Sequence, residues 1–247
     1  MKQFKIIEIA GRRRREKRDW VAAEFPLTID VNAKKAASLA CTPRDLKDLV
    51  VGHLYAKGFI NSLGDLRSLT VAARRHRASA EVRSRLSSQV PARRKNGRQL
   101  GFPVEHRAIF RLSKTFQRKS AEFRKTGALH SAALCCRDKI LIFREDMGRH
   151  NALDKVLGAA LRKKLDLEGT FIFITSRVQA EIMNTIVRAR VPLLASTSAP
   201  SDRAIQIARR EGVTLVGFAR GDRFNIYSAS GRVKWDATRP SRPRISE

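Results

Sequence analysis

A dense run of polar and ionisable residues occupies positions 144–155, with the sequence REDMGRHNALDK. Eight of these twelve positions carry ionisable or amide groups. Such a set can supply acid–base chemistry or bind an anion, and it can also form a structural ion-pair network. On a helix, Asn151, Asp154 and Lys155 share one face, because positions three and four apart are neighbours. The residues alone leave both interpretations open.

The chain has three cysteines, Cys41, Cys135 and Cys136. This odd, low number excludes a disulfide scaffold, and the absence of any CxxC pair excludes a zinc knuckle or zinc finger. Cys135 and Cys136 stand at the end of a predicted strand, where one is expected to face the core and the other the solvent. Arg137 and Lys139 are near enough in sequence to activate a thiolate. Both cysteines are therefore weak candidates for a reactive thiol, against the alternative of an inert buried one.

The elements that must position these groups alternate between strand and helix in the second half of the chain. This order predicts a parallel sheet covered by helices, an α/β fold. Before it, the pattern predicts a helix at 104–124, strands at 129–134 and 140–143, and a helix at 150–164. The alternating elements are a strand at 170–175, a helix at 178–190, a strand at 191–196, a helix at 198–211, and strands at 213–218 and 223–230.

Ligands of parallel sheets bind beyond the carboxyl ends of the strands. The sequence places Thr175-Ser176-Arg177, Thr197-Ser198-Ala199 and Arg220-Gly221-Asp222-Arg223 at those ends. Hydroxyls, guanidiniums and free backbone N–H groups suit a phosphorylated ligand, although the Ser and Thr residues could also serve only as helix caps. The residues predicted to line this pocket are His130, Arg144, Asp146, Arg149, His150, Asn151, Asp154, Lys155, Ser176, Arg177 and Ser198.

The N-terminal part predicts a smaller α+β arrangement. Residues 26–31 alternate as a half-buried strand does, and a helix is expected from Thr42, as its cap, to Gly58. The chain of 247 residues carries 51 Lys and Arg against 23 Asp and Glu, a net charge of +28. Half of that excess lies in residues 1–18 and 71–100. The second stretch has no apolar period and no aromatic residue, which predicts a solvated basic loop or, alternatively, a nucleic-acid-binding arm.

No apolar run approaches the roughly 20 residues that span a bilayer. The first twenty residues lack the pattern of a signal peptide, because their apolar stretch is short and contains Glu8. We therefore expect a cytoplasmic protein that does not contact membranes.

Several long motifs, in order, resemble one family. TGALHSAAL (126–134), REDMGRHNALDKVLGAAL (144–161), VPLLASTSAP (191–200) and VTLVGFARGDRFNIY (213–227) are similar to the formate dehydrogenase accessory proteins of the FdhD/NarQ type. EFPLTIDVN (24–32) and CTPRDLKDLVVGHLYAKGFI (41–60) are similar to their N-terminal part.

The resemblance implies a sulfurtransferase. Such proteins take sulfur from a cysteine desulfurase as a cysteine persulfide and pass it to the molybdenum cofactor for formate dehydrogenase. They bind the bis(molybdopterin guanine dinucleotide) form of that cofactor, and a homodimer is one expected assembly. The implied fold is a cytidine-deaminase-like αβα domain with a smaller N-terminal α+β domain, without the zinc signature of a deaminase. The dinucleotide-binding stretch carries over onto Phe218, Ala219, Arg220, Gly221, Asp222 and Arg223.

Two departures from the family pattern matter. The cysteine motif of the family, typically CGxCG, belongs in the interval 71–100, which contains no cysteine, and Ala128 replaces a usual glycine. Either this chain is a cofactor-binding chaperone without sulfur chemistry, or a frameshift crosses the interval. A basic nucleic-acid-binding protein is a third hypothesis. The predicted division is a basic segment at 1–18, an α+β part at 19–70, a basic, disordered or frameshifted stretch at 71–102, the α/β domain at 103–235 and a loose tail at 236–247.

Overall fold

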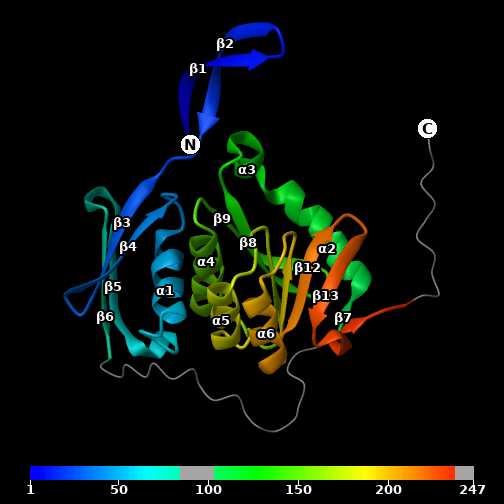
Figure 1. Ribbon diagram of the computed structural model, residues 1–247. Helices are drawn as coiled ribbons and strands as arrows, with labels where there is room; N and C mark the ends of the chain where they lie inside the picture. The colour runs from blue at the N-terminus through cyan, green and yellow to red at the C-terminus, as the bar shows by residue number, and fades with distance from the viewer. Residues whose placement is uncertain (84–102, 237–247) are drawn as a thin grey trace.

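The computed structural model describes residues 1–83 and 103–236, and its main body is a six-stranded mixed sheet (Figure 1). The strand order is β13-β12-β11-β10-β8-β9. The six strands are β8 (His130–Cys136), β9 (Lys139–Asp146), β10 (Phe171–Ile174), β11 (Leu193–Ser196), β12 (Thr214–Arg220) and β13 (Arg223–Ser228).

The strand directions correct one prediction. Only β10, β11 and β12 are mutually parallel, as the strand–helix alternation predicts. The strands β8, β9 and β13 run antiparallel to their neighbours. These three follow or precede short turns, and a short turn reverses the chain where a helical crossover would preserve its direction. The sheet is therefore mixed, with a parallel centre.

Helices cover both faces of this sheet because alternate strand residues are apolar on both sides. Ile172 and Ile174 pack with one core, which also contains residues of α4 (Arg149–Arg162), α5 (Ala180–Arg188) and α6 (Asp202–Arg210). Phe171 and Phe173 pack with a second core against α2 (His106–Lys119). Helix α3 (Ala121–Thr126) follows α2, so the helix predicted over 104–124 is broken at Ser120. The result is a helix–sheet–helix arrangement.

A second, four-stranded sheet belongs to the N-terminal part, in the order β4-β3-β6-β5. Its strands are β3 (Phe25–Val31), β4 (Lys34–Cys41), β5 (Leu66–Ala72) and β6 (Arg77–Val82), with η1 (Leu63–Asp65) before β5 and η2 (Ala73–Arg75) after it. The prediction of a loop from residue 71 onward is wrong for β6, and the boundary at 70 falls inside β5. In β6, Ala78, Ala80 and Val82 are buried at every second position. The remainder of that stretch, residues 84–102, lies outside the described residues.

Helix α1 (Leu46–Ala56) lies between the two sheets and crosses α4 at very short range (Figure 1). A methyl group added at Gly52 would lie 1.7 Å from the backbone oxygen of Asp154, and one at Gly158 would lie 1.9 Å from that of Asp48. Only glycine permits this backbone approach. The predicted start of α1 at Thr42 is wrong, since the helix begins at Leu46 with Asp45 as its N-cap residue.

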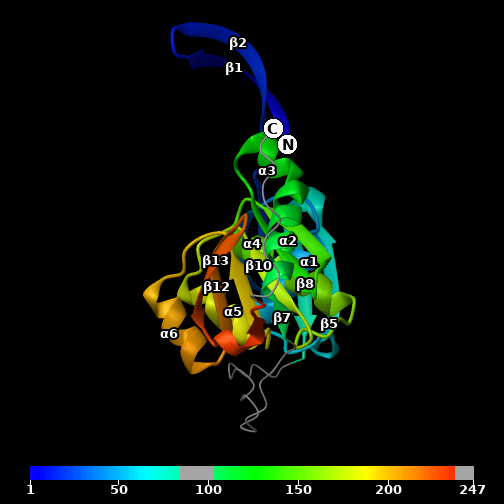
Figure 2. The ribbon, with the colours of Figure 1, turned by 90° about the vertical axis from the view of Figure 1, so that its right-hand side faces the viewer.

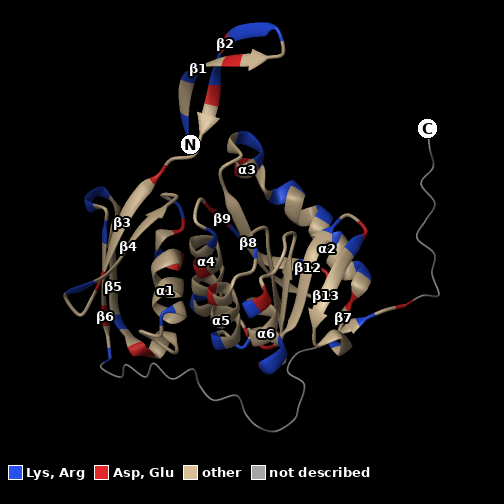
Figure 3. Ribbon diagram, in the orientation of Figure 1, with Lys and Arg blue, Asp and Glu red and all other residues tan. Residues whose placement is uncertain are grey.

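The first 21 residues form a hairpin of β1 (Lys2–Ala10) and β2 (Arg13–Val21), which projects from the body beside α3 (Figures 1 and 2). At the far end of the chain, η3 (Ser230–Arg232) leads into β14 (Val233–Lys234), which pairs with β7 (Val104–Glu105). Lys and Arg residues are numerous on the hairpin and along α2 (Figure 3). Among the described residues, no helix is long and apolar enough to cross a membrane.

Candidate functional site

The carboxyl ends of the parallel strands gather most of the predicted pocket residues. Ser176 and Arg177 follow β10, and Ser198 follows β11. His130 begins the antiparallel β8 opposite Asp146 at the end of β9, so both lie at this same edge. The backbone N–H of Thr175 donates to Ser131 O at 3.1 Å, and that of Thr197 donates to Ile174 O at 3.0 Å. We call this side of the sheet the carboxyl edge.

Arg149 and His150 begin α4 at the carboxyl edge, and each side chain has a polar atom without a hydrogen bond to a described residue. Arg149 Nη2 donates to Gln179 Oε1 at 2.5 Å, while its buried Nε makes no hydrogen bond with any described residue. His150 Nε2 lies 3.2 Å from Glu181 Oε2 without forming a hydrogen bond. Burial, reinforced by the Arg149 charge, lowers the pKa of His130 and of His150. Burial thus favours the neutral form of both imidazoles, which lie beside an arginine whose Nε has no hydrogen-bond partner among the described residues.

The turn from β12 to β13 is anchored at its start and open at its tip. Phe218 has a φ of 53°, and its N–H donates to Ser198 O at 3.1 Å. Arg220 Nε donates to Thr197 O at 2.7 Å, which ties the turn to the end of β11. Gly221 has a φ of +59° with open space around it, and Asp222 and Arg223 are exposed. The predicted binding stretch 218–223 therefore presents exposed guanidiniums and backbone at the carboxyl edge.

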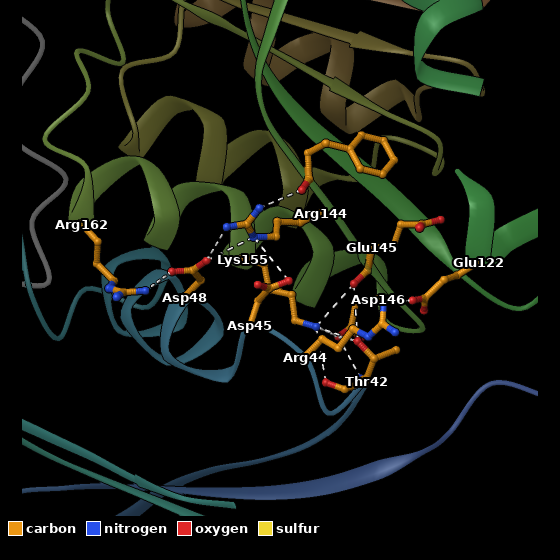
Figure 4. A network of polar contacts seen from close by, with 11 residues as sticks. Thr42, Arg44, Asp45, Asp48, Glu122, Arg144, Glu145, Asp146, Lys155 and Arg162 are labelled. Atoms are coloured by element: carbon orange, nitrogen blue, oxygen red, sulfur yellow. Dashed lines mark hydrogen bonds and ion pairs between the residues drawn. The ribbon is translucent and has the colours of Figure 1, made fainter. Parts of the chain in front are cut away.

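Asp146 and Lys155 do not line a pocket. Both side chains are fully buried, with Lys155 Nζ 2.6 Å from Asp146 Oδ2 (Figure 4). Asp146 also accepts from Thr42 N at 2.9 Å, Gly148 N at 2.9 Å and Asn151 Nδ2 at 3.0 Å. Lys155 donates to Thr42 Oγ1 at 2.7 Å. This network joins the segment after β4 to α4, so these residues form a structural link between the two parts of the chain.

Arg144 and Asp154 of the cluster face α1. Arg144 Nη2 donates to Asp48 Oδ2 at 2.8 Å, and Arg162 pairs with the other oxygen of Asp48 (Figure 4). Asp154 Oδ2 lies 3.1 Å from His53 Nδ1, and both side chains are buried. Of the eleven residues predicted to line the pocket, Arg144, Asp146, Asn151, Asp154 and Lys155 belong to this structural interface. The structure brings the other six to the carboxyl edge.

Glu145 belongs to the polar cluster but is not among the residues predicted to line the pocket, and its side chain alternates to the opposite face of β9 from Arg144 and Asp146. It is partly buried beside α3, where it accepts from Phe123 N at 3.3 Å and from Ser131 Oγ at 3.5 Å. Burial raises its pKa. Ser120 Oγ lies 2.9 Å from Ser131 Oγ and extends this polar group. The period-two alternation of side chains along a strand could have predicted that Glu145 lies on this face.

Two of the three cysteines are buried, and the third, Cys136, lies at the edge of the sheet opposite to the carboxyl edge. Cys41 and Cys135 are fully buried, and burial raises the pKa of Cys41 to about 12 and that of Cys135 further still. Cys41 Sγ donates to Phe25 O at 3.4 Å, as expected for a structural thiol. Cys136 is partly exposed, at the end of β8 opposite to His130. A strand of this length places the two residues about 20 Å apart.

The structure is a mixed α/β protein that presents exposed guanidiniums and backbone beyond the carboxyl ends of its parallel strands. The chain belongs to the FdhD/NarQ family, whose model matches residues 22–234.

Three relatives illustrate the family. The sulfur carrier protein FdhD of Geobacillus kaustophilus is 35% identical to this chain, covering 88% of this chain and 91% of that protein. The protein of the same name from Listeria innocua is 34% identical, covering 86% and 91%. A crystal structure of a proposed formate dehydrogenase accessory protein from Desulfotalea psychrophila matches with a TM-score of 0.82 and 25% identity, covering 94% of this chain and 98% of that one.

Proposed function

We propose that this chain is an accessory sulfurtransferase of formate dehydrogenase, which receives sulfur from a cysteine desulfurase and passes it to the molybdenum cofactor. The observation that carries the proposal is the match of the whole region 22–234 to a family whose members are named sulfur carrier proteins. The name of the structural relative from Desulfotalea psychrophila supplies formate dehydrogenase as the client.

The cargo in this proposal is bis(molybdopterin guanine dinucleotide), held at the turn 218–223. Arg223 and Arg220 offer guanidiniums, and the glycine at 221 leaves room for close approach of a phosphate. Arg149 supports the same assignment, because its buried Nε has no hydrogen-bond partner among the described residues. The helix–sheet–helix layering supports the cytidine-deaminase-like description that we propose for the main domain.

Sulfur transfer requires a thiolate that attacks the outer sulfur of the desulfurase persulfide. The new S–S bond forms on the attacking cysteine, and the desulfurase cysteine leaves as its thiolate, so the exchange is redox-neutral. Cys136 is the one cysteine of this chain with an exposed surface, and its neighbours are Arg137 and Lys139. We assign the carrier role in this proposal to Cys136.

A second candidate function is that of a cofactor chaperone without sulfur chemistry. The observation that favours it is the position of Cys136 at the opposite edge of the sheet from the turn 218–223. A persulfide on Cys136 would therefore be remote from a cofactor bound at that turn. Its sulfur would have to reach the opposite edge of the sheet or be passed to a cofactor bound by another copy of the protein.

Incubation with a cysteine desulfurase and cysteine, followed by peptide mass spectrometry, separates the two functions. The sulfurtransferase gains one sulfur atom on Cys136, and Cys136→Ser removes that gain. Cys41→Ser is the matched control and leaves the gain intact. If the wild-type chain binds guanine nucleotide but gains no sulfur, it is a chaperone. If it does neither, both functions are wrong.

A further inference from the structure

The outward face of α2 carries several basic residues and no acidic one. Arg111, Lys114 and Arg118 recur at three- and four-residue intervals and are exposed, and residues 106–119 include no Asp or Glu. The opposite face carries Ile109, Leu112 and Phe116, which are buried against the sheet. Packing of the apolar face thus fixes the direction in which the charged face points.

Part of this face is hollowed. A depression of about 490 Å³ is lined by Lys114, Gln117, Arg118 and Arg124. Its volume lies within the range of about 300–1,000 Å³ that is usual for small-molecule sites. None of the four lining residues is acidic, and three are cationic. The depression is therefore suited to an anion rather than to an apolar ligand.

Arg124 is positioned for this role by backbone contacts. Its Nη1 donates to Gln117 O at 2.8 Å and to Arg118 O at 2.5 Å, the carbonyl groups at the end of α2. This contact holds the guanidinium over the last turn of the helix. It also offsets the negative end of the helix dipole, which would otherwise repel an anion at that place.

The depression adjoins the turn from β12 to β13. Lys114 Nζ lies 2.9 Å from Asp222 Oδ1, and both side chains are more than half exposed, at 56% and 65%. An exposed pair of this kind contributes little stability, so a phosphate can readily displace the carboxylate. One ligand can then span the turn 218–223 and the depression.

We propose that the depression on α2 binds the phosphate groups of the guanine dinucleotide, with Lys114, Arg118 and Arg124 as the contacting cations. This inference rests on the proposed function, because it adds a second wall to the same cofactor site. Arginine forks bind phosphate oxygens in pairs, and lysine supplies a third, flexible charge.

The test measures the equilibrium binding of inorganic pyrophosphate and of GDP by titration calorimetry. The double variant Lys114→Gln/Arg118→Gln removes two of the three cations, and we expect it to bind each ligand at least about tenfold more weakly. Arg111→Gln is the matched control, since Arg111 lies on the same helix face, outside the depression. We expect a change of less than about twofold for it. Both positions are exposed, so circular dichroism should show unchanged folding.

The failures are distinguishable. If pyrophosphate does not bind, or binds equally well to Lys114→Gln/Arg118→Gln, the inference about α2 is wrong, whatever GDP does. If Arg220→Gln/Arg223→Gln leaves GDP binding unchanged while the α2 variant abolishes pyrophosphate binding, the assignment of the cofactor to the turn 218–223 fails instead. If duplex DNA displaces pyrophosphate and binds more tightly than GDP, the basic face serves nucleic acid and the proposal falls.

Discussion

Replacement of Lys155 by methionine tests whether the buried network at the start of α4 is structural. Met has nearly the same length and no charge, so Lys155→Met leaves the Asp146 carboxylate fully buried without its cation. Removal of one partner of a buried ion pair destabilises a protein by about 3–5 kcal/mol. Asp146 retains hydrogen bonds from Thr42 N, Gly148 N and Asn151 Nδ2, which favours the lower end, about 3 kcal/mol.

The measurement is urea unfolding followed by far-ultraviolet circular dichroism, with a parallel thermal scan. For a chain of this size, about 3 kcal/mol corresponds to a fall in Tm of roughly 6–12 °C. Asp146→Asn combined with Lys155→Met completes a double-mutant cycle. We expect the double variant to be at least about 1 kcal/mol more stable than the sum of the single effects predicts, because its uncompensated charge is gone.

A matched surface pair provides the control. Arg190 lies 3.4 Å from Glu168, with both side chains about 40% exposed. Arg190→Gln should change the free energy of unfolding by less than about 1 kcal/mol. If Lys155→Met also changes it by less than about 1 kcal/mol, or if the cycle shows no coupling, the reasoning about this network is refuted.

Three further predictions concern packing, pH and thiol reactivity. Gly52→Ala should destabilise the chain by about 3 kcal/mol, because its methyl group would lie 1.7 Å from Asp154 O and force α1 and α4 apart; urea unfolding measures this. The free energy of unfolding should decrease as the pH falls through about 6.5. Burial lowers the pKa of His130 and His150 in the folded protein, so the unfolded chain takes up protons first. Urea midpoints at a series of pH values measure this. Iodoacetamide should alkylate Cys136 in the native protein and the other two cysteines only after unfolding, as peptide mass spectrometry can determine.

Each of these has its own control. Gly64→Ala meets only Ser62 Oγ at 3.3 Å and should be nearly neutral, so an equal loss in both glycine variants would contradict the packing argument. Replacement of both histidines by glutamine should flatten the pH dependence, and an unchanged slope would assign it to other groups. Alkylation of Cys135 in the native state would contradict its burial in the core between the sheet and α2.

Apolar periodicity was sufficient to predict the centre of the fold. The buried strands at 171–174 and 193–196 and the helix between them follow directly from it. The strand β6 was not predicted because alanine gives a weak apolar signal, and the neighbours of Ala78 and Ala80 are arginine, serine and glutamate. The hairpin in the basic segment at 1–18 was likewise not predicted, since nothing in the composition of that segment indicates that two charged strands pair.

The candidate site was harder to predict for a different reason. The sequence identified the cluster at 144–155 correctly as polar but could not show its partners. Thr42 contacts Asp146 from 104 positions away, and Asp48 contacts Arg144 from 96 positions away. These partners are distant in sequence and become neighbours only through the packing of α1 and the segment before it against α4. The strand ends were easier to predict, because topology alone brings Ser176 and Ser198 to one edge.

The crossing of α1 and α4 has a consequence for synthesis on the ribosome. About 100 residues of chain separate the end of α1 at Ala56 from the end of α4 at Arg162. At roughly 5–20 residues per second, α1 emerges about 5–20 seconds before its partner is complete. During that interval the face of α1 that packs against α4 in the finished protein lacks its partner. The nascent chain is therefore most exposed to aggregation, and most in need of a chaperone, while the stretch between these two helices is being translated.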